Sequence, residues 1–138
     1  MLTDILVDTG PLVALFDKDD HYHSHITAFT RGKGYRFHTT LAVLTELLHL
    51  VDFHVQVQLN VLRWVAGGGV VLHDIGTEEL HRICELSEQY SDLPMDFADA
   101  TLVVVAEKTG IRSIISIDSD FDVYRLPEKE HIHNIFRP

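Results

Sequence analysis

A short apolar stretch that stops at a carboxylate is the feature that most constrains the fold of this chain. Ile5, Leu6 and Val7 are apolar and two of them are β-branched, which predicts a short buried strand. Asp8 follows directly, and Gly10-Pro11 then predicts a turn with Pro11 at the first position of a helix. Ligands of parallel α/β sheets bind at the carboxyl ends of such strands. Asp8 is therefore the first candidate functional residue.

Length and composition are those of an ordinary globular protein. The 138 residues fit one domain, and 46% hydrophobic with 23% charged residues is a typical balance. No apolar run approaches the roughly 18 residues that span a bilayer, and the N-terminus lacks the pattern of a secretory signal. The one cysteine, Cys84, excludes an internal disulfide and is expected to be a small core residue. We expect a single domain over residues 1–138, in the cytoplasm and without a membrane segment.

Strand-like and helix-like segments alternate along the chain. This alternation predicts an α/β fold whose mainly parallel central sheet is covered by helices on both sides. Thr40 and Thr77 are expected to cap two of the helices. Strands are expected near residues 5–7, 35–39, 70–72, 114–117 and 132–136, and helices near residues 12–16, 21–30, 41–64 with a break around 52–54, 77–89 and 97–108.

Acidic residues stand where several of these elements end or begin. Asp8 and Asp118 each follow an apolar strand, so both should lie at the same edge of a parallel sheet. Helices that follow such strands begin at that edge. Glu46 lies in the second turn of one of them, and Asp99 lies near the start of another, three residues after Asp96. Asp99 is on an apolar helix face, where an acid is costly unless it is paired or bound to a metal ion.

A cluster of carboxylates from distant parts of a chain needs either raised pKa values or a cation. Two negative charges about 4 Å apart repel by roughly 1 kcal/mol in water, and by more in a partly buried cleft. Oxygen ligands alone suit Mg²⁺ or Mn²⁺ better than zinc, and such an ion can orient a water and offset charge on a phosphate. Each acid could instead cap a helix or face solvent. Their expected convergence at one edge favours a metal site that hydrolyses phosphodiesters.

Four acidic motifs resemble those of PIN-domain ribonucleases, and most of all the VapC-type toxins of bacterial and archaeal toxin–antitoxin pairs. Their order and spacing match across nearly the whole chain. The resemblance implies a PIN-like, three-layer α/β/α sandwich and Mg²⁺- or Mn²⁺-dependent endonucleolytic cleavage of RNA. The motifs are Val7-Asp8-Thr9-Gly10, Leu44-Thr45-Glu46-Leu47, Leu93-Pro94-Met95-Asp96-Phe97-Ala98-Asp99-Ala100 and Ser116-Ile117-Asp118-Ser119-Asp120-Phe121.

The resemblance also implies roles for individual residues. Gly10 stands where a Ser or Asn commonly follows the Asp-Thr pair, so no side-chain hydrogen bond is available from that position. The catalytic and metal-binding quartet would be Asp8, Glu46, Asp99 and Asp118, with Asp96, Thr9 and Ser116 as accessory residues.

Partners are implied in the same way: an RNA substrate, a second copy of the chain in a homodimer, and a small basic cognate antitoxin. The formal net charge of −10 argues against tight, non-specific binding of nucleic acid through a broad basic face. The same charge is compatible with a basic protein partner.

Other functions remain open at this point. An RNA-maturation nuclease without an antitoxin, or a catalytically silent binding module of the same fold, would carry similar motifs. Asp8-Thr9-Gly10 also spells the aspartic protease motif, although the helix-rich pattern after it argues against that mostly β class. His21, His23 and His25 would share one face of an extended segment and could chelate a transition metal, but a helix, which is expected here, would separate them.

Overall fold

The protein is built on a parallel sheet of five strands in the order β3-β2-β1-β4-β5. The structure, a computed structural model, describes residues 2–92, 95–126 and 130–137. β1 occupies the centre of the sheet between β2 and β4, which confirms the predicted α/β fold with a parallel sheet. The strands are β1 (Thr3–Val7), β2 (Tyr35–Thr40), β3 (Val70–His73), β4 (Ser113–Ile115) and β5 (His133–Asn134).

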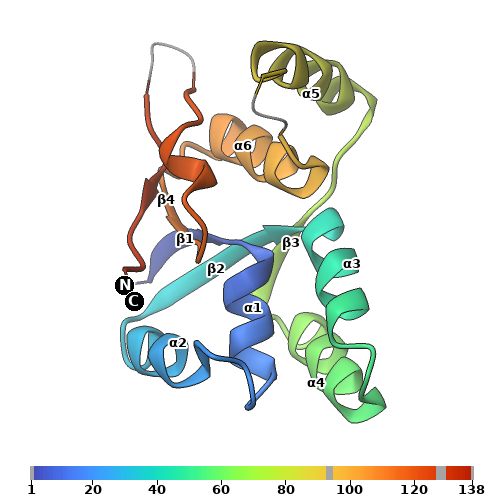
Figure 1. Ribbon diagram of the computed structural model, residues 1–138, viewed down its shortest axis with the longest axis vertical. Helices are drawn as coiled ribbons and strands as arrows, with labels where there is room; N and C mark the ends of the chain where they lie inside the picture. Colours follow the sequence, from blue (N-terminus) through green and yellow to red (C-terminus); the bar gives the residue numbers. More distant parts are fainter. Residues whose placement is uncertain (1, 93–94, 127–129, 138) are drawn as a thin grey trace.

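Helices cover both faces of this sheet. The helices of the described residues are α1 (Thr9–Phe16), α2 (His23–Thr30), α3 (Leu41–Leu50), α4 (Val55–Ala66), α5 (Thr77–Gln89), α6 (Phe97–Thr109) and the 3-10 helix η1 (Asp120–Asp122). Figure 1 shows α1, α2 and α4 on one side of the sheet and α5 and α6 on the other. α3 contacts both α1 and α6. The arrangement is the expected α/β/α sandwich. Within the described part of the chain, no helix is both long and apolar enough to cross a membrane.

The central strands and α6 form the core. Ile5 and Leu6 of β1 and Ile114 and Ile115 of β4 are completely buried. Helix α6 is buried on all sides between Ala98 and Ala106, and a helix that is apolar all round is a buried one. An acid near the start of α6 is therefore surrounded by protein rather than by solvent.

Helix α1 begins earlier than the sequence predicts. Gly10-Pro11 was expected to form a turn, but α1 starts at Thr9 and Asp8 is its N-cap. Pro11 is thus the third helical residue, a position that proline tolerates because the first four N–H groups of a helix have no partner within it. The correction places the Asp8 carboxylate directly at a helix N-terminus.

Strand β4 is shorter than predicted. An unbroken strand over residues 114–117 was expected to end at Asp118, but the pairing of β4 with β1 ends at Ile115. Ser116 is held by a side chain instead, because its N–H donates to Oδ1 of Asn134 at 3.1 Å and its carbonyl accepts from Nδ2 at 2.9 Å. Asp118 consequently lies in the bend between β4 and η1 rather than at the strand end.

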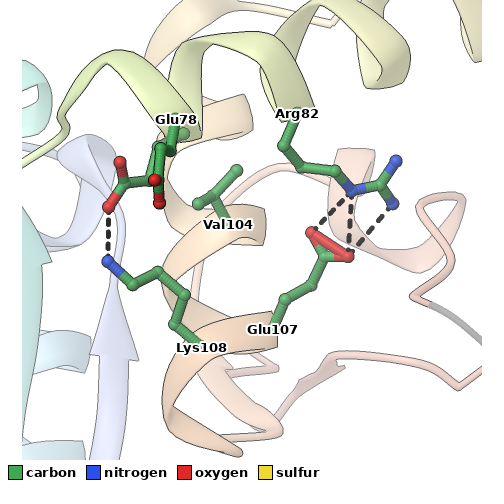
Figure 2. A pocket seen from close by; sticks show the side chains of 6 residues that line it. Glu78, Arg82, Val104, Glu107 and Lys108 are labelled. Carbon is green, nitrogen blue, oxygen red and sulfur yellow. Dashed lines mark hydrogen bonds and ion pairs between the residues drawn. The ribbon is translucent and has the colours of Figure 1, made fainter.

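Two ion pairs attach α5 to α6. Figure 2 shows the guanidinium of Arg82 on α5 against the carboxylate of Glu107 on α6, with Nε 3.0 Å from Oε1 and 3.1 Å from Oε2. Lys108 pairs with Glu79, and Val104 lies between the two pairs. Both cations of this pocket are engaged by carboxylates, so we assign the pocket to helix packing.

Cys84 is exposed, so its predicted core position is wrong. The buried face of α5 is formed by Ile83 and Leu86. One residue step turns a helix by about 100°, which carries Cys84 away from that face.

Candidate active site

Asp8 lies at the carboxyl end of the central strand and at the start of α1. Its backbone N–H donates to the carbonyl of Ile115 at 3.0 Å, and its Oδ1 accepts from the N–H of Thr9 at 2.8 Å. The residue is only 5% exposed. The helix N-terminus favours the ionised carboxylate, whereas burial opposes it.

Ser116 connects the carboxylates of Asp8 and Asp118. Its hydroxyl donates to Oδ2 of Asp8 at 3.1 Å and lies 3.5 Å from Oδ1 of Asp118. The same Oδ1 accepts from the N–H of Asp120 at 3.0 Å. The structure thus brings Asp8 and Asp118 together, as the strand-end argument predicts, even though β4 stops short of Asp118.

Asp99 enters the site from α6. It is the third residue of this helix, it is 6% exposed, and its Oδ2 accepts from the hydroxyl of Tyr124 at 3.2 Å. Asp96 is the N-cap of the same helix, where its Oδ1 accepts from the N–H of Ala98 at 2.7 Å. Asp96 therefore has a structural role as a cap, and its carboxylate is exposed at the margin of the site.

Glu46 lies on α3, which is joined to α6 near its start, and its charge acts on Asp8. Thr40 caps α3 as predicted, since its Oγ1 accepts from the N–H of Val43 at 3.3 Å. The same Oγ1 shares a hydrogen bond of 2.8 Å with Oγ1 of Thr101 on α6, and both threonines are completely buried. This contact ties the helix that carries Glu46 to the helix that carries Asp99.

Burial and mutual repulsion raise the pKa values of the two most enclosed acids. Burial raises the pKa of Asp8 to about 7, and the charges of Asp118 and Glu46 act in the same direction. Burial also raises the pKa of Asp99 to about 8, with the charges of Asp8, Asp118 and Asp96 adding to the shift. Asp8, Asp99 and Asp118 therefore lie within electrostatic reach of one another, and Glu46 lies within reach of Asp8.

Asp120 belongs to the same negative region. Burial raises the pKa of its carboxyl group, and the charges of Asp118 and Asp96 raise it further. In the residues that the structure describes, none of the predicted site acids forms an ion pair with a Lys, Arg or His side chain. The repulsion among these acids is therefore left without a neutralising side chain.

The donor chemistry of the site fits a divalent cation. The candidate ligands are carboxylates, which Mg²⁺ and Mn²⁺ prefer. The buried Oγ1 of Thr9, next to Asp8, has no hydrogen-bond partner among the described residues, and such a group is ordinarily satisfied by water or a ligand. Over residues 2–92, 95–126 and 130–137, no three His, Cys, Asp or Glu side chains are grouped closely enough to enclose an ion. The fit lies in charge and donor type rather than in a preformed ligand shell.

Two residues that support the site were not predicted from the sequence. Tyr124 donates to Asp99, and Asn134 holds the backbone of Ser116. Asn134 lies within the predicted strand over residues 132–136, close to Ile132 and Ile135, and that position could have indicated a buried role. No comparable signal marks Tyr124.

Two alternatives from the sequence find no support in the fold. A parallel sheet between helices is not the mostly β fold of aspartic proteases, so that interpretation of Asp8-Thr9-Gly10 is wrong. His23 begins α2 and its Nδ1 lies 2.7 Å from the carbonyl of Ala14, so this ring is engaged in packing α2 onto α1.

Comparison with known proteins points to one family. The family described as PIN domain matches residues 5–126, a range that contains all four acidic motifs. Ribonuclease VapC26 of Mycobacterium tuberculosis (strain ATCC 25618 / H37Rv) is 30% identical over 116 residues, which cover 83% of this chain and 86% of the relative.

Two solved structures share the fold. VapC20 of Mycobacterium tuberculosis, described as a Sarcin-Ricin loop cleaving toxin, matches with a TM-score of 0.78 and 23% identity over 86% of this chain and 92% of that one. VapBC2 from Rickettsia felis, bound to a DNA fragment from its promoter, matches with a TM-score of 0.61 and 15% identity over 87% of this chain and 92% of that one.

Proposed function

This chain belongs to the PIN-domain family, and from that premise we propose that it is a Mg²⁺- or Mn²⁺-dependent endoribonuclease, the toxin of a VapBC-type toxin–antitoxin pair. The observation that carries the proposal is the enclosure of Asp8 and Asp99 beside the charges of Asp118 and Glu46, in a site where none of these four acids pairs with a cationic side chain among the described residues. The relative VapC26 is named a ribonuclease and VapC20 is described as a toxin, which supports the same activity here.

In this proposal the four acids bind the divalent ion, and neighbouring residues hold them in place. When bound, the ion would polarise the attacked phosphate and favour deprotonation of the attacking water. Ser116 orients Asp8 and Asp118 through its hydroxyl. Asp96 caps α6 and adds negative charge beside Asp99, and Thr9, next to Asp8, offers a hydroxyl that has no partner among the described residues.

Hydrolysis then requires water to attack the phosphorus while the bond to the 3′-oxygen breaks. The expected products are a 5′-phosphate and a 3′-hydroxyl. A reaction of this kind needs no covalent intermediate on the protein, and no Ser-His or Cys-His pair accompanies the described acids.

The direct test is RNA cleavage by the purified chain with Mn²⁺ or Mg²⁺, with EDTA as the quench. Asp8→Asn removes one charge from the site and is expected to fold and to lose cleavage. The matched control is Asp19→Asn, which makes the same chemical change at an exposed position between α1 and α2 and should cut RNA like the wild type.

Different outcomes separate the alternatives. Cleavage by Asp8→Asn at the wild-type rate would contradict the proposed site. Wild-type protein that binds RNA but never cuts it at saturating metal would be a silent binding module of this fold. If the protein cuts RNA but no small basic protein is encoded next to it, an RNA-maturation nuclease would be favoured.

The proposed partners are a basic antitoxin and a second copy of the chain. Exposed apolar side chains, Leu41, Leu80 and Phe97, surround a pocket of about 360 Å³, and exposed apolar patches of this kind mark protein contacts. Leu80→Glu should shift the mass measured by light scattering toward the monomer, whereas Leu62→Glu on α4 should not. We also propose that the protein is cytosolic. Its proposed substrate, cellular RNA, is found there, and a chain with one cysteine needs no oxidising compartment for an internal disulfide.

A further inference from the structure

Tyr124 reaches the candidate site from a distant part of the chain. It follows η1, and its hydroxyl donates to Oδ2 of Asp99 on α6 at 3.2 Å. Tyr124 is 2% exposed and Asp99 is 6% exposed, so this contact is made inside the protein.

Among the described residues, Tyr124 is the one side chain that donates a hydrogen bond to the Asp99 carboxylate. Asp8, by comparison, has two donors, the N–H of Thr9 on Oδ1 and the hydroxyl of Ser116 on Oδ2. For Asp99, the bond to Oδ2 leaves Oδ1 as the oxygen available to a cation, and it restricts rotation of the carboxylate about its last bond.

The Tyr124 ring is held by packing that does not involve its hydroxyl. Its ring centroid lies 5.4 Å from that of Phe121 and 5.3 Å from that of Tyr90, both in edge-to-face contact. The hydroxyl of Tyr90 points to a different partner, since it accepts from the backbone N–H of Arg125 at 2.7 Å. The two tyrosines therefore share one aromatic cluster, but only Tyr124 donates to an acid of the site.

We propose that Tyr124 is a positioning residue for metal binding: its hydroxyl holds the Asp99 carboxylate in the orientation that binds the divalent ion. The inference rests on the proposed metal-dependent function. Hydrogen bonds to metal-ligating side chains orient the ligand, and loss of one typically weakens metal affinity about 10- to 100-fold. A change at Tyr124 should therefore act on metal affinity before it acts on the chemical step.

Tyr124→Phe tests this inference because it removes the hydroxyl and keeps the ring. The measurement is Mn²⁺ binding to the full chain without RNA, by isothermal titration and by electron paramagnetic resonance of free Mn²⁺. Tyr90→Phe is the matched control, since it removes a hydroxyl from the same cluster without touching Asp99. We expect Tyr124→Phe to bind Mn²⁺ about 10-fold more weakly than the wild type and Tyr90→Phe to bind it within about twofold.

The Mn²⁺ dependence of RNA cleavage is a second measurement, and a purely structural role of Tyr124 would not change it in the way described next. Tyr124→Phe should need about 10-fold more Mn²⁺ for half-maximal RNA cleavage, and saturating Mn²⁺ should restore most of the rate. Thermal melting of both variants without metal shows whether each is folded. A loss of affinity that is the same in Tyr90→Phe would instead reflect damage to the aromatic cluster and would overturn the inference.

The inference and the proposed function fail in different ways. Wild-type protein that binds Mn²⁺, together with Tyr124→Phe that binds it equally well, would overturn the role of Tyr124 alone. Wild-type protein that does not bind Mn²⁺ or Mg²⁺ would overturn the metal-dependent function and the inference with it.

Discussion

The hydroxyl of Ser116 donates to Oδ2 of Asp8, a residue that directly follows the central strand β1 and lies 108 positions earlier in the chain. The same hydroxyl lies 3.5 Å from Oδ1 of Asp118. A neutral donor between two carboxylates lowers their repulsion only in part, since burial still raises the pKa of Asp8 to about 7 and the charge of Asp118 adds to the shift. The site is thus held in shape by hydrogen bonds, while the repulsion among its acids opposes their ionisation.

Loss of the Ser116 hydroxyl should impair cleavage without unfolding the protein. Ser116→Ala keeps the backbone bonds to Asn134 but removes the hydroxyl that contacts both Asp8 and Asp118. We expect RNA cleavage to fall about 10-fold, the usual cost of removing a hydrogen bond that orients a metal ligand. Initial rates at fixed Mn²⁺ measure the effect, with the exposed Ser87→Ala as control. Equal rates for both variants would show that Ser116 does not position the acids.

The stability of the metal-free protein should fall as the pH rises. A carboxyl group whose pKa rises on folding binds its proton more tightly in the folded state, so its ionisation at higher pH favours unfolding. For Asp99 the pKa moves from 3.8 to about 8, so this loss should extend from about pH 4 to about pH 8. Chemical denaturation in EDTA at several pH values measures it.

Asp99→Asn should remove part of that pH dependence. The amide has the shape of the carboxyl group and can still accept from the Tyr124 hydroxyl, but it carries no charge. We expect the variant to be about 1–3 kcal/mol more stable than the wild type at pH 8 and similar to it near pH 4. A pH profile parallel to that of the wild type would contradict the raised pKa, and Asp19→Asn should show such a parallel profile.

Divalent metal should stabilise the protein more at high pH than at low pH. Binding requires ionised carboxylates, so protons compete with the ion while Asp8 and Asp99 titrate. At 100 times its dissociation constant, Mn²⁺ should add about 2.7 kcal/mol at pH 8 and clearly less at pH 5. Thermal melting with Mn²⁺ or EDTA measures the difference. Asp8→Asn should lose most of it, and a shift of equal size at both pH values would argue against carboxylate ligands.

Asn134→Ala should destabilise the fold through Ser116. The Asn134 side chain accepts from the N–H groups of Ser116 and Phe136 and donates to the carbonyl of Ser116, and the residue is 8% exposed. Leaving these buried backbone groups unpaired should cost about 2–3 kcal/mol. Asn60→Ala, on the surface of α4, should stay within about 0.5 kcal/mol of the wild type. Urea unfolding of both variants measures these changes in the free energy of unfolding, and equal values for the two variants would contradict the role of Asn134.

The family and the fold were predictable because their signals are local. The apolar run before Asp8 and the alternation of strands with helices predict a parallel α/β sheet, and the sheet confirms this. The resemblance to VapC-type PIN ribonucleases is likewise confirmed by the family match over residues 5–126 and by 30% identity to VapC26. The roles of Asp8, Glu46, Asp99 and Asp118 as metal ligands stay predictions.

Two predictions were wrong: the length of β4, where a tertiary contact replaced a local preference, and the burial of Cys84, where its position around the helix decided. The apolar run after Ser113 predicts a longer β4, but Asn134 takes over the backbone groups of Ser116 and ends the strand. Cys84 lies in an apolar helix pattern, yet it falls just outside the face of α5 that packs on α6.

Sequence alone determined which acids are present and that Asp8 lies at the carboxyl edge of the sheet, because a buried parallel strand must deliver the residue that follows it to that edge. Only the tertiary structure decided how those acids are held. The hydroxyls of Ser116 and Tyr124 reach Asp8 and Asp99 from segments far away in the chain. Such contacts depend on how whole elements pack, and burial of the assembled site is what raises the pKa values of Asp8 and Asp99.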